Sequence, residues 1–254
     1  MCANTDLGKA KKMLSQLDAN HDYEVTTGNP RFLEHAREVI FGGIDPIPEC
    51  STITSVQAIS GTGSIHLAAL FLSRTPAFQG KNVYIGTPAW GNYVPLFNLV
   101  GLEVVTYNHY DPQRGTVDFD SVMAAVQQAP KGSIFVLQSC CHNPSGADFS
   151  REQWNELSDT MREKEHFPLF DVAYQGLGNS LDDDAYGIRL FRDKGFELIA
   201  CQSFSKNFGL YGERVGVLHA VSDSKGTAST VYESLRCLIR WEFSSSPVRS
   251  PPLK

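Results

Sequence analysis

Two side chains that can act as acid, base or nucleophile follow apolar segments of the chain. Asp171 ends the run Pro168-Leu-Phe-Asp171, and Lys206 lies in the run Gln202-Ser-Phe-Ser-Lys-Asn-Phe-Gly209. A lysine flanked by Ser, Phe, Asn and Gly is no part of a solvated charge run, and its amine can form an imine and move protons between carbon atoms. A carboxylate at a strand end can keep a pyridine-type ring nitrogen protonated, which makes the ring an electron sink.

Several hydroxyl groups and one arginine accompany Lys206 and are suited to a phosphate group. Ser203 and Ser205 flank Phe204, and Arg214 in Gly212-Glu-Arg-Val-Gly216 offers a bidentate fork. The run Ser60-Gly61-Thr62-Gly63 precedes an apolar helix expected over 64–72, where free backbone N–H groups and a Thr hydroxyl can cradle phosphate. Together with Lys206 and Asp171, this pattern predicts a site for pyridoxal phosphate.

Three further side chains could contact such a ring. Tyr174 could donate to its phenolic oxygen, Asn143 in His142-Asn-Pro-Ser-Gly146 could reach the same oxygen, and Trp90 could stack on the ring. Each candidate alone also has a structural explanation. These explanations are a loop cap for Asp171, a core-edge position for Tyr174, an ion pair for Arg214, a helix N-cap for Ser60 to Gly63, core packing for Trp90, and a turn for Asn143.

An alternation of strands and helices positions these residues. Short buried strands are expected at 82–86, 102–106, 133–138, 168–171 and 197–201, and helices at 91–100, 118–128, 152–164 and 184–194. This rhythm predicts an α/β fold whose mostly parallel sheet is flanked by helices, with ligand groups at the carboxyl ends of the strands. We expect a helix and loop segment over 1–30, a cofactor-binding large domain over 31–243, and an irregular Ser/Pro-rich tail over 244–254.

The composition of the chain indicates its cellular location and the classes of partner that it does not bind. The 254-residue chain has a formal charge of 22 − 28 = −6, which gives no electrostatic reason to bind nucleic acid or an anionic membrane. No apolar run is long enough to span a bilayer, and the first twenty residues do not resemble a targeting peptide. The six cysteines show no metal-ligand spacing, so we expect no metal and a reduced, cytoplasmic location, with a mitochondrial one as the alternative.

The combined motifs resemble the aspartate aminotransferase branch of the fold-type I pyridoxal phosphate enzymes. The shared runs are Ser60–Gly63, Pro88–Trp90, His142–Gly146, Asp171–Gly176 and Gln202–Gly216, and the resemblance extends from about 23 to about 247. It implies that Lys206 forms the Schiff base and carries the proton. It also implies that Asp171 pairs with the ring nitrogen, and that Asn143 and Tyr174 bind the ring oxygen. The remaining implied contacts are Trp90 on the ring and Ser60, Gly61, Thr62, Ser203, Ser205 and Arg214 on the phosphate.

The resemblance also implies a homodimer. Tyr23 would reach the phosphate of the neighbouring subunit, and Arg240 would bind the substrate's side-chain carboxylate across the dimer. An arginine left without its carboxylate is costly when buried, so Arg240 would favour dicarboxylic substrates. Substrate contacts are thus expected from Trp90, Asn143 and Arg240, with amino acids and 2-oxo acids as the small-molecule partners.

The sequence departs from the family at several positions. Gln138 and Tyr93 each replace a histidine, and Ser244-Ser-Ser-Pro247 replaces a Ser-Asn-Pro-Pro pattern. Family members are longer on both sides, and the arginine that binds the α-carboxylate belongs to a C-terminal small domain that has no counterpart among these residues.

The resemblance implies transamination between L-aspartate and 2-oxoglutarate, giving oxaloacetate and L-glutamate. Because a bidentate contact to the substrate is lost, we expect the truncated chain to keep the cofactor site and to have weak activity or none. An aromatic amino acid aminotransferase is the sister alternative. The other alternative is a catalytically defective isoform that only binds the cofactor or dimerises.

Overall fold

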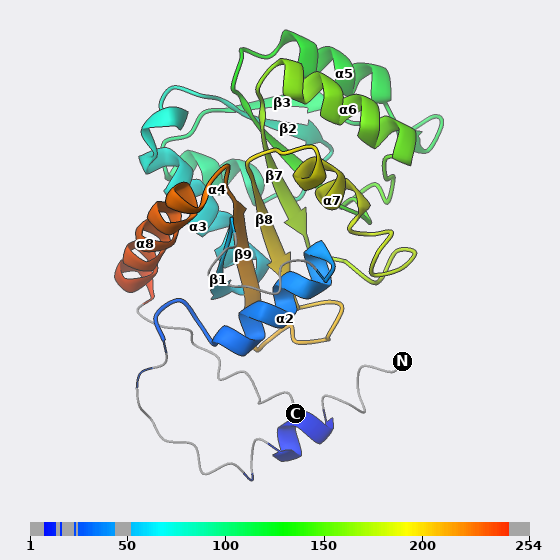
Figure 1. Ribbon diagram of the computed structural model, residues 1–254. Coiled ribbons are helices and arrows are strands. Elements are labelled where there is room, and N and C mark those ends of the chain that lie inside the picture. The colour runs from blue at the N-terminus through cyan, green and yellow to red at the C-terminus, as the bar shows by residue number, and fades with distance from the viewer. Residues whose placement is uncertain (1–7, 14–15, 17–22, 24, 44–51, 244–254) are drawn as a thin grey trace.

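The computed structural model describes residues 8–13, 16, 23, 25–43 and 52–243. A seven-stranded sheet forms its centre, with the strand order β1-β9-β8-β7-β6-β2-β3 (Figure 1). Its strands are β1 (Ile53–Ile59), β2 (Val83–Thr87), β3 (Val104–Asn108), β6 (Ile134–Gln138), β7 (Phe167–Val172), β8 (Leu198–Ser203) and β9 (Val215–Val221). The run from β8 to β3 is parallel, and β9 is antiparallel to both of its neighbours. The predicted mostly parallel sheet is confirmed.

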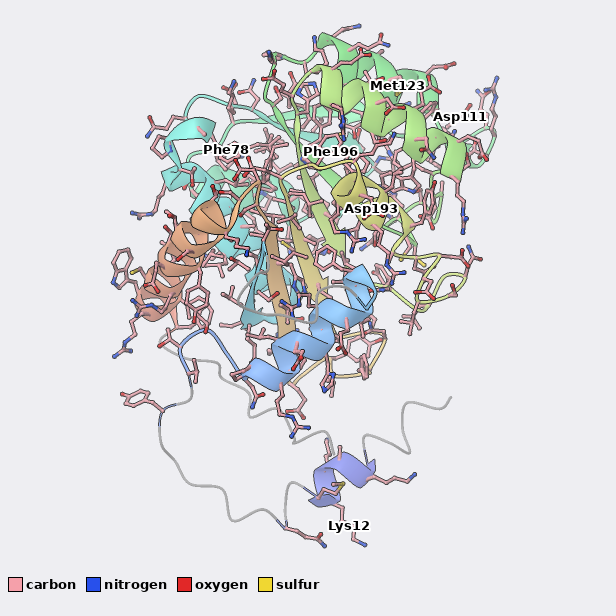
Figure 2. The ribbon with its side chains drawn as sticks, viewed as in Figure 1. Lys12, Phe78, Asp111, Met123, Asp193 and Phe196 are labelled. Atoms are coloured by element: carbon pink, nitrogen blue, oxygen red, sulfur yellow. The ribbon has the colours of Figure 1, made fainter. Side chains whose placement is uncertain are left out.

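Helices cover both faces of this sheet. One face carries α3 (Ser60–Arg74), α4 (Tyr93–Leu99) and α8 (Lys225–Glu242), and the other carries α2 (Pro30–Phe41), α5 (Phe119–Gln128), α6 (Arg151–Glu163) and α7 (Tyr186–Asp193). A 3-10 turn, η2 (Pro76–Phe78), and a small hairpin of β4 (Tyr110–Asp111) and β5 (Thr116–Val117) complete the fold. Each layer has its own apolar core: the partly buried Phe78 packs against the first, and Met123 belongs to the second (Figure 2).

Local sequence explains where several helices begin. Asn29 caps α2 by accepting a hydrogen bond from the Phe32 backbone N–H, and Pro30 is the first helical residue, where its missing N–H costs nothing. Ser150 and Gln153 form a reciprocal capping box at the start of α6. Both caps fix the direction in which the chain enters its helix.

Five predicted strands and four predicted helices are present, with ends that differ by about two residues. Three differences concern the site. Ser60 to Gly63 form the first turn of α3 instead of preceding it, and Gly28-Asn29-Pro30 leads directly into α2. The strand β9 was not expected, because its first residues belong to the Gly212–Gly216 run that was interpreted as a phosphate loop.

The three-part division of the chain stays a prediction. Residues 8–13 are helical, as expected for part of the first segment, and the tail over 244–254 lies outside the described residues. Among the helices of the described ranges, none has the length and apolar character needed to cross a bilayer.

Candidate active site

A pocket of about 150 Å³ lies where β6, β7, β8 and the start of α3 meet. Its walls include all the predicted cofactor contacts except Tyr23. The lining residues are Ser60, Gly61, Thr62, Ile65, Trp90, Gln138, Asn143, Asp171, Ala173, Tyr174, Ser203, Ser205, Lys206, Tyr211 and Arg214. Residues spread over more than 150 positions of the chain therefore converge at the carboxyl ends of the parallel strands.

Three serine hydroxyls form one end of the pocket. The Ser60 Oγ lies 2.6 Å from the Ser205 Oγ and 3.3 Å from the Ser203 Oγ, and all three residues are buried. Ser60 has a positive φ of 60°, an uncommon conformation for a residue with a side chain. A Cβ on Gly216 would lie 2.6 Å from the Ser60 carbonyl carbon, so only glycine allows β9 to approach this turn. The backbone conformation at Ser60 and the close approach of Gly216 thus bring these hydroxyls together.

Arg214 also reaches this end of the pocket. Its φ is 55°, its backbone carbonyl accepts a hydrogen bond from the Ser60 N–H at 3.1 Å, and its Nη1 donates to the Tyr211 carbonyl at 2.9 Å. Arg214 therefore lines the same pocket as the serine hydroxyls, and its backbone is bonded to that of Ser60. Hydroxyl donors beside an arginine and a helix N-terminus form a site suited to a phosphate group.

A buried carboxylate also lines the pocket. Asp171 is 8% exposed at the end of β7, and its Oδ2 accepts a hydrogen bond of 2.5 Å from the hydroxyl of Tyr93. Burial raises the pKa of Asp171, while the Tyr93 hydrogen bond and the charge of Lys206 act in the opposite direction. Within the described residues, Asp171 Oδ1 makes no hydrogen bond, which leaves it available to a ligand.

Lys206 lines the pocket together with these residues. Its Nζ is 4.6 Å from the ring centroid of Tyr174, which is partly buried and lines the same pocket. The pKa of Tyr174 is raised, first by burial and then by the negative charge of Asp171. The following residue, Asn207, donates to the Gln175 carbonyl at 3.2 Å and fixes the loop that carries the lysine. An amine, a phenol and a carboxylate therefore face one small volume.

Asn143 and Trp90 complete the walls. The backbone N–H of Asn143 donates to Gln138 Oε1 at 2.8 Å, and Gln138 Nε2 donates back to the Asn143 carbonyl at 3.2 Å. This two-bond clamp holds the Asn143 backbone and leaves its side chain facing the pocket. The indole of Trp90 meets the ring of Tyr93 edge to face, with centroids 5.3 Å apart.

Two predicted site residues lie elsewhere. Tyr23 is 85% exposed, and the guanidinium of Arg240, at the end of α8, lies 5.8 Å from its ring centroid. Neither residue lines the pocket around Lys206. Their placement agrees with the expectation that they serve a different subunit, and their roles stay predictions.

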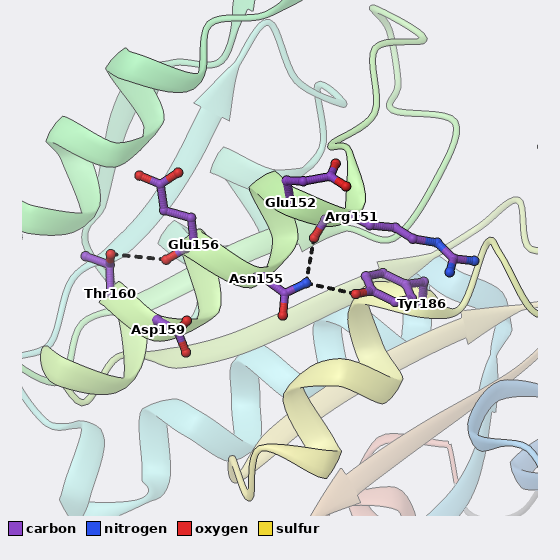
Figure 3. A pocket seen from close by; sticks show the side chains of 7 residues that line it. All are labelled: Arg151, Glu152, Asn155, Glu156, Asp159, Thr160 and Tyr186. Carbon is purple, nitrogen blue, oxygen red and sulfur yellow. Dashed lines mark hydrogen bonds between the residues drawn. The ribbon is translucent and has the colours of Figure 1, made fainter.

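A larger hollow of about 700 Å³ lies on the outside of α6 (Figure 3). Two of its charged residues already have partners, since Arg151 pairs with Asp183 at 2.6 Å and Asp159 pairs with Lys194 at 2.6 Å. Asn155 bonds to Tyr186 and to the Arg151 carbonyl. Exposed and internally satisfied groups offer little to a ligand, so the smaller pocket is the candidate site despite its size.

Sequence reasoning missed three features of the pocket. Tyr211 and Ile65 line it, and Tyr93 contacts Asp171 although it was noted only as a departure from the family. A signal existed for Tyr93, because it follows Trp90 by three residues, across a turn whose Tyr93 N–H donates to the Trp90 carbonyl. Nothing in the sequence predicts that this turn packs against the end of β7.

The sequence model of the family described as aminotransferase class I and II matches residues 5–249. The chain belongs to this family. As a class I and II aminotransferase it has the fold-type I architecture, and the expectation of pyridoxal 5′-phosphate as the cofactor is confirmed by the family.

Individual relatives agree with the assignment. Aminotransferase tasG of Hapsidospora irregularis is 59% identical over 77% of this chain and 60% of its own length. The chloroplastic aspartate aminotransferase of Arabidopsis thaliana is 39% identical over 94% of this chain and 53% of its own. The aromatic-amino-acid aminotransferase of Burkholderia pseudomallei, covalently bound to pyridoxal phosphate, has a TM-score of 0.92 at 34% identity, covering 98% of this chain and 61% of that one. The aminotransferase chain thus spans little more than half the length of such relatives.

The pocket of this aminotransferase fits the cofactor of its family. A phosphate matches the cluster of Ser60, Ser203 and Ser205 beside Arg214, and a ring nitrogen matches the open oxygen of Asp171. The amine of Lys206, which lines the same pocket, is the group suited to the aldehyde of the cofactor. Phosphate, aldehyde and ring nitrogen therefore each have a chemically suitable partner.

Proposed function

We propose that this chain binds pyridoxal 5′-phosphate through Lys206 and transfers the amino group of L-aspartate to 2-oxoglutarate, giving oxaloacetate and L-glutamate. The observation that supports it most is the single pocket shared by Lys206, Asp171 and the serine cluster. The relatives named aspartate aminotransferase add support for the substrates.

Each side chain has a role that its surroundings allow. The bound cofactor supplies an electron-withdrawing ring that stabilises negative charge on the substrate's α-carbon. Asp171 holds a proton on the ring nitrogen, because a buried anion next to that nitrogen favours its charged form. The Lys206 amine removes and returns the α-proton of the substrate, and Tyr174 donates a hydrogen bond to the ring oxygen.

The remaining residues orient the reactants. The side-chain amide of Asn143 reaches the same ring oxygen, and Trp90 covers the ring and excludes water. Ser60, Gly61, Thr62, Ser203, Ser205 and Arg214 neutralise the phosphate, which anchors the cofactor so that the Cα–H bond of the substrate meets the lysine. Precise orientation of this kind contributes much of an enzyme's rate.

A cofactor titration tests the core of the proposal. The purified chain and Lys206→Ala are mixed with pyridoxal phosphate, and the visible absorbance and the mass of the adduct after borohydride reduction are measured. In the native chain we expect an absorbance band of the lysine-bound cofactor and a stable adduct on Lys206. In Lys206→Ala we expect neither the band nor the adduct. An unmodified Lys206 in the native chain would contradict the proposal.

Substrate choice needs a second assay. Turnover of aspartate and of phenylalanine, each with 2-oxoglutarate, is measured with the native chain and with Arg240→Ala as the matched variant. Aspartate should be preferred, and the variant should lose that preference. A preference for phenylalanine would favour the aromatic alternative, for which the Burkholderia pseudomallei structure is a precedent. Cofactor binding without turnover would identify a chain that only binds the cofactor or dimerises.

We also propose a homodimer, because Tyr23 and Arg240 lie outside the pocket of their own chain. Trp241, beside Arg240, is 71% exposed, as expected for a residue that a second copy covers. Mixing Lys206→Ala with Arg240→Ala tests this arrangement, because a mixed dimer regains one complete site. Activity that rises on mixing supports the shared site, and activity that stays at the level of the parents opposes it.

A cytoplasmic location is proposed from the cysteines. Cys140, Cys141, Cys201 and Cys237 are all free thiols, which suits a reducing compartment. Relatives of this chain include a chloroplastic enzyme, so the location needs its own experiment. Cell fractionation with an antibody to the native chain would decide between the cytoplasm and an organelle.

A further inference from the structure

Tyr93 joins two parts of the site that are far apart in sequence. It is the first residue of α4, its side chain is 1% exposed, and its hydroxyl donates to Asp171 Oδ2 at 2.5 Å. The same ring meets Trp90 edge to face, with centroids 5.3 Å apart. One side chain therefore contacts both the carboxylate and the indole of the pocket.

Among the described residues, the other groups that face Asp171 make no hydrogen bond to its carboxylate. Gln138 on β6 and Cys201 on β8 are its in-register neighbours, and burial raises the pKa of the Cys201 thiol, which stays neutral. Lys206 contributes positive charge from its loop, and Tyr174 lies after the strand end. Tyr93 is thus the neutral hydrogen-bond donor to this carboxylate among the described residues.

The phenol keeps its proton throughout the neutral range. Burial, followed by the charge of Asp171, raises the pKa of Tyr93 well above its ordinary value. Its hydroxyl can therefore donate to the carboxylate without ever adding a positive charge beside it. An imidazole at the same place would change its charge close to neutral pH.

We propose that Tyr93 is a positioning residue for the cofactor: it holds Asp171 Oδ2, so that Oδ1 is presented to the ring nitrogen, and it keeps the carboxylate and Trp90 in one arrangement. The proposal rests on the proposed function, because the ring nitrogen belongs to the cofactor. Its effect on Asp171 itself does not depend on any ligand and can be measured separately.

The test compares the native chain with Tyr93→Phe, which removes the hydroxyl and keeps the ring. Tyr84→Phe is the matched control, since Tyr84 is a buried tyrosine of β2 that packs in the other apolar core. Carbon-13 NMR follows the Asp171 carboxyl against pH in the cofactor-free chain, and calorimetry measures binding of pyridoxamine phosphate, which needs no covalent bond to lysine. Thermal unfolding checks that each variant is folded.

In Tyr93→Phe the carboxyl should titrate at higher pH than in the native chain, and pyridoxamine phosphate should bind about tenfold more weakly, as expected for a lost hydrogen bond to a charged group. Tyr84→Phe should match the native chain in both measurements. An unchanged carboxyl titration in Tyr93→Phe would overturn the proposal. If the native chain does not bind pyridoxamine phosphate, the proposed function fails, and the carboxyl titration still decides the role of Tyr93.

Tyr93→His gives a second, independent variant. Its imidazole can restore a donor, so affinity for pyridoxamine phosphate should recover in part relative to Tyr93→Phe, and should now change with pH as the imidazole gains its proton. An affinity that follows the same pH profile as the native chain would show that the group at this position does not act on Asp171.

Discussion

Two buried aspartates of this chain differ in how far the protein satisfies them. Asp184 is 3% exposed and accepts three backbone hydrogen bonds, from Gly176 and Gly178 at Oδ2 and from Asn179 at Oδ1, at 2.8–3.0 Å. Asp171 is 8% exposed and accepts one bond, at Oδ2. Three bonds close a loop around Asp184, whereas one bond leaves half of Asp171 for a ligand. Incomplete satisfaction of a buried charge thus distinguishes the carboxylate that we propose to be functional from the structural one.

The largest expected effect that tests this difference is the loss of activity when Asp171 is replaced. Asp171→Asn keeps the shape but removes the charge that holds the proton on the ring nitrogen, so transamination should fall on the order of 1000-fold. Turnover of aspartate, measured with saturating pyridoxal phosphate, checks this. A variant within about tenfold of the native rate would show that the charge is dispensable.

Asp184→Asn should act on stability instead. Loss of a charge that accepts three backbone N–H bonds should lower the free energy of unfolding by about 3 kcal/mol. Urea denaturation of the cofactor-free chain measures the loss. Once folded at low temperature, this variant should bind pyridoxamine phosphate as the native chain does; a selective loss of binding with unchanged stability would reverse the two roles.

The smallest expected effect is a gain in the stability of the cofactor-free chain when Asp171 is replaced by Asn. Since burial raises the pKa of Asp171 in the folded state, folding binds a proton more tightly there, and stability falls as pH rises from the unfolded pKa through the folded one. Asp171→Asn removes that cost and should stabilise the cofactor-free chain at neutral pH by about 1 kcal/mol. The advantage should shrink in acid, where the native carboxyl is protonated. Thermal melts at pH 7 and pH 4 compare the two proteins, and an advantage that grows in acid would show that the sign is wrong.

Sequence patterns predicted the parallel half of the fold well. Apolar runs at β2, β6, β7 and β8 are short and bounded by turn residues, so their length and flanking residues identify them as buried strands. The long helix α8 and the strand β9 were missed. The strand β9 was missed because its first residues overlap the run of glycines and arginine that was interpreted as a phosphate loop.

The part of the site whose residues lie close together in the sequence was predictable. Lys206, Ser203 and Ser205 share one loop, and Asp171 ends a strand, so their types and positions were enough. The bond between Tyr93 and Asp171 was not predictable, because it joins α4 to β7 across 78 positions. Contacts of this kind depend on how two elements pack, and no pattern within either element records them.

The pairing of β8 with β9 has a consequence for the order in which the site assembles. Ser203 pairs with Gly216, so Lys206 and Arg214 belong to a hairpin whose closure spans few residues. The contact of Asp171 with Tyr93 closes a much longer loop, and such contacts form more slowly because they restrict more chain. We expect a refolding chain to form the hairpin that carries Lys206 before it forms the contact between Asp171 and Tyr93. The cofactor could then bind to Lys206 before Asp171 is in place beside its ring nitrogen.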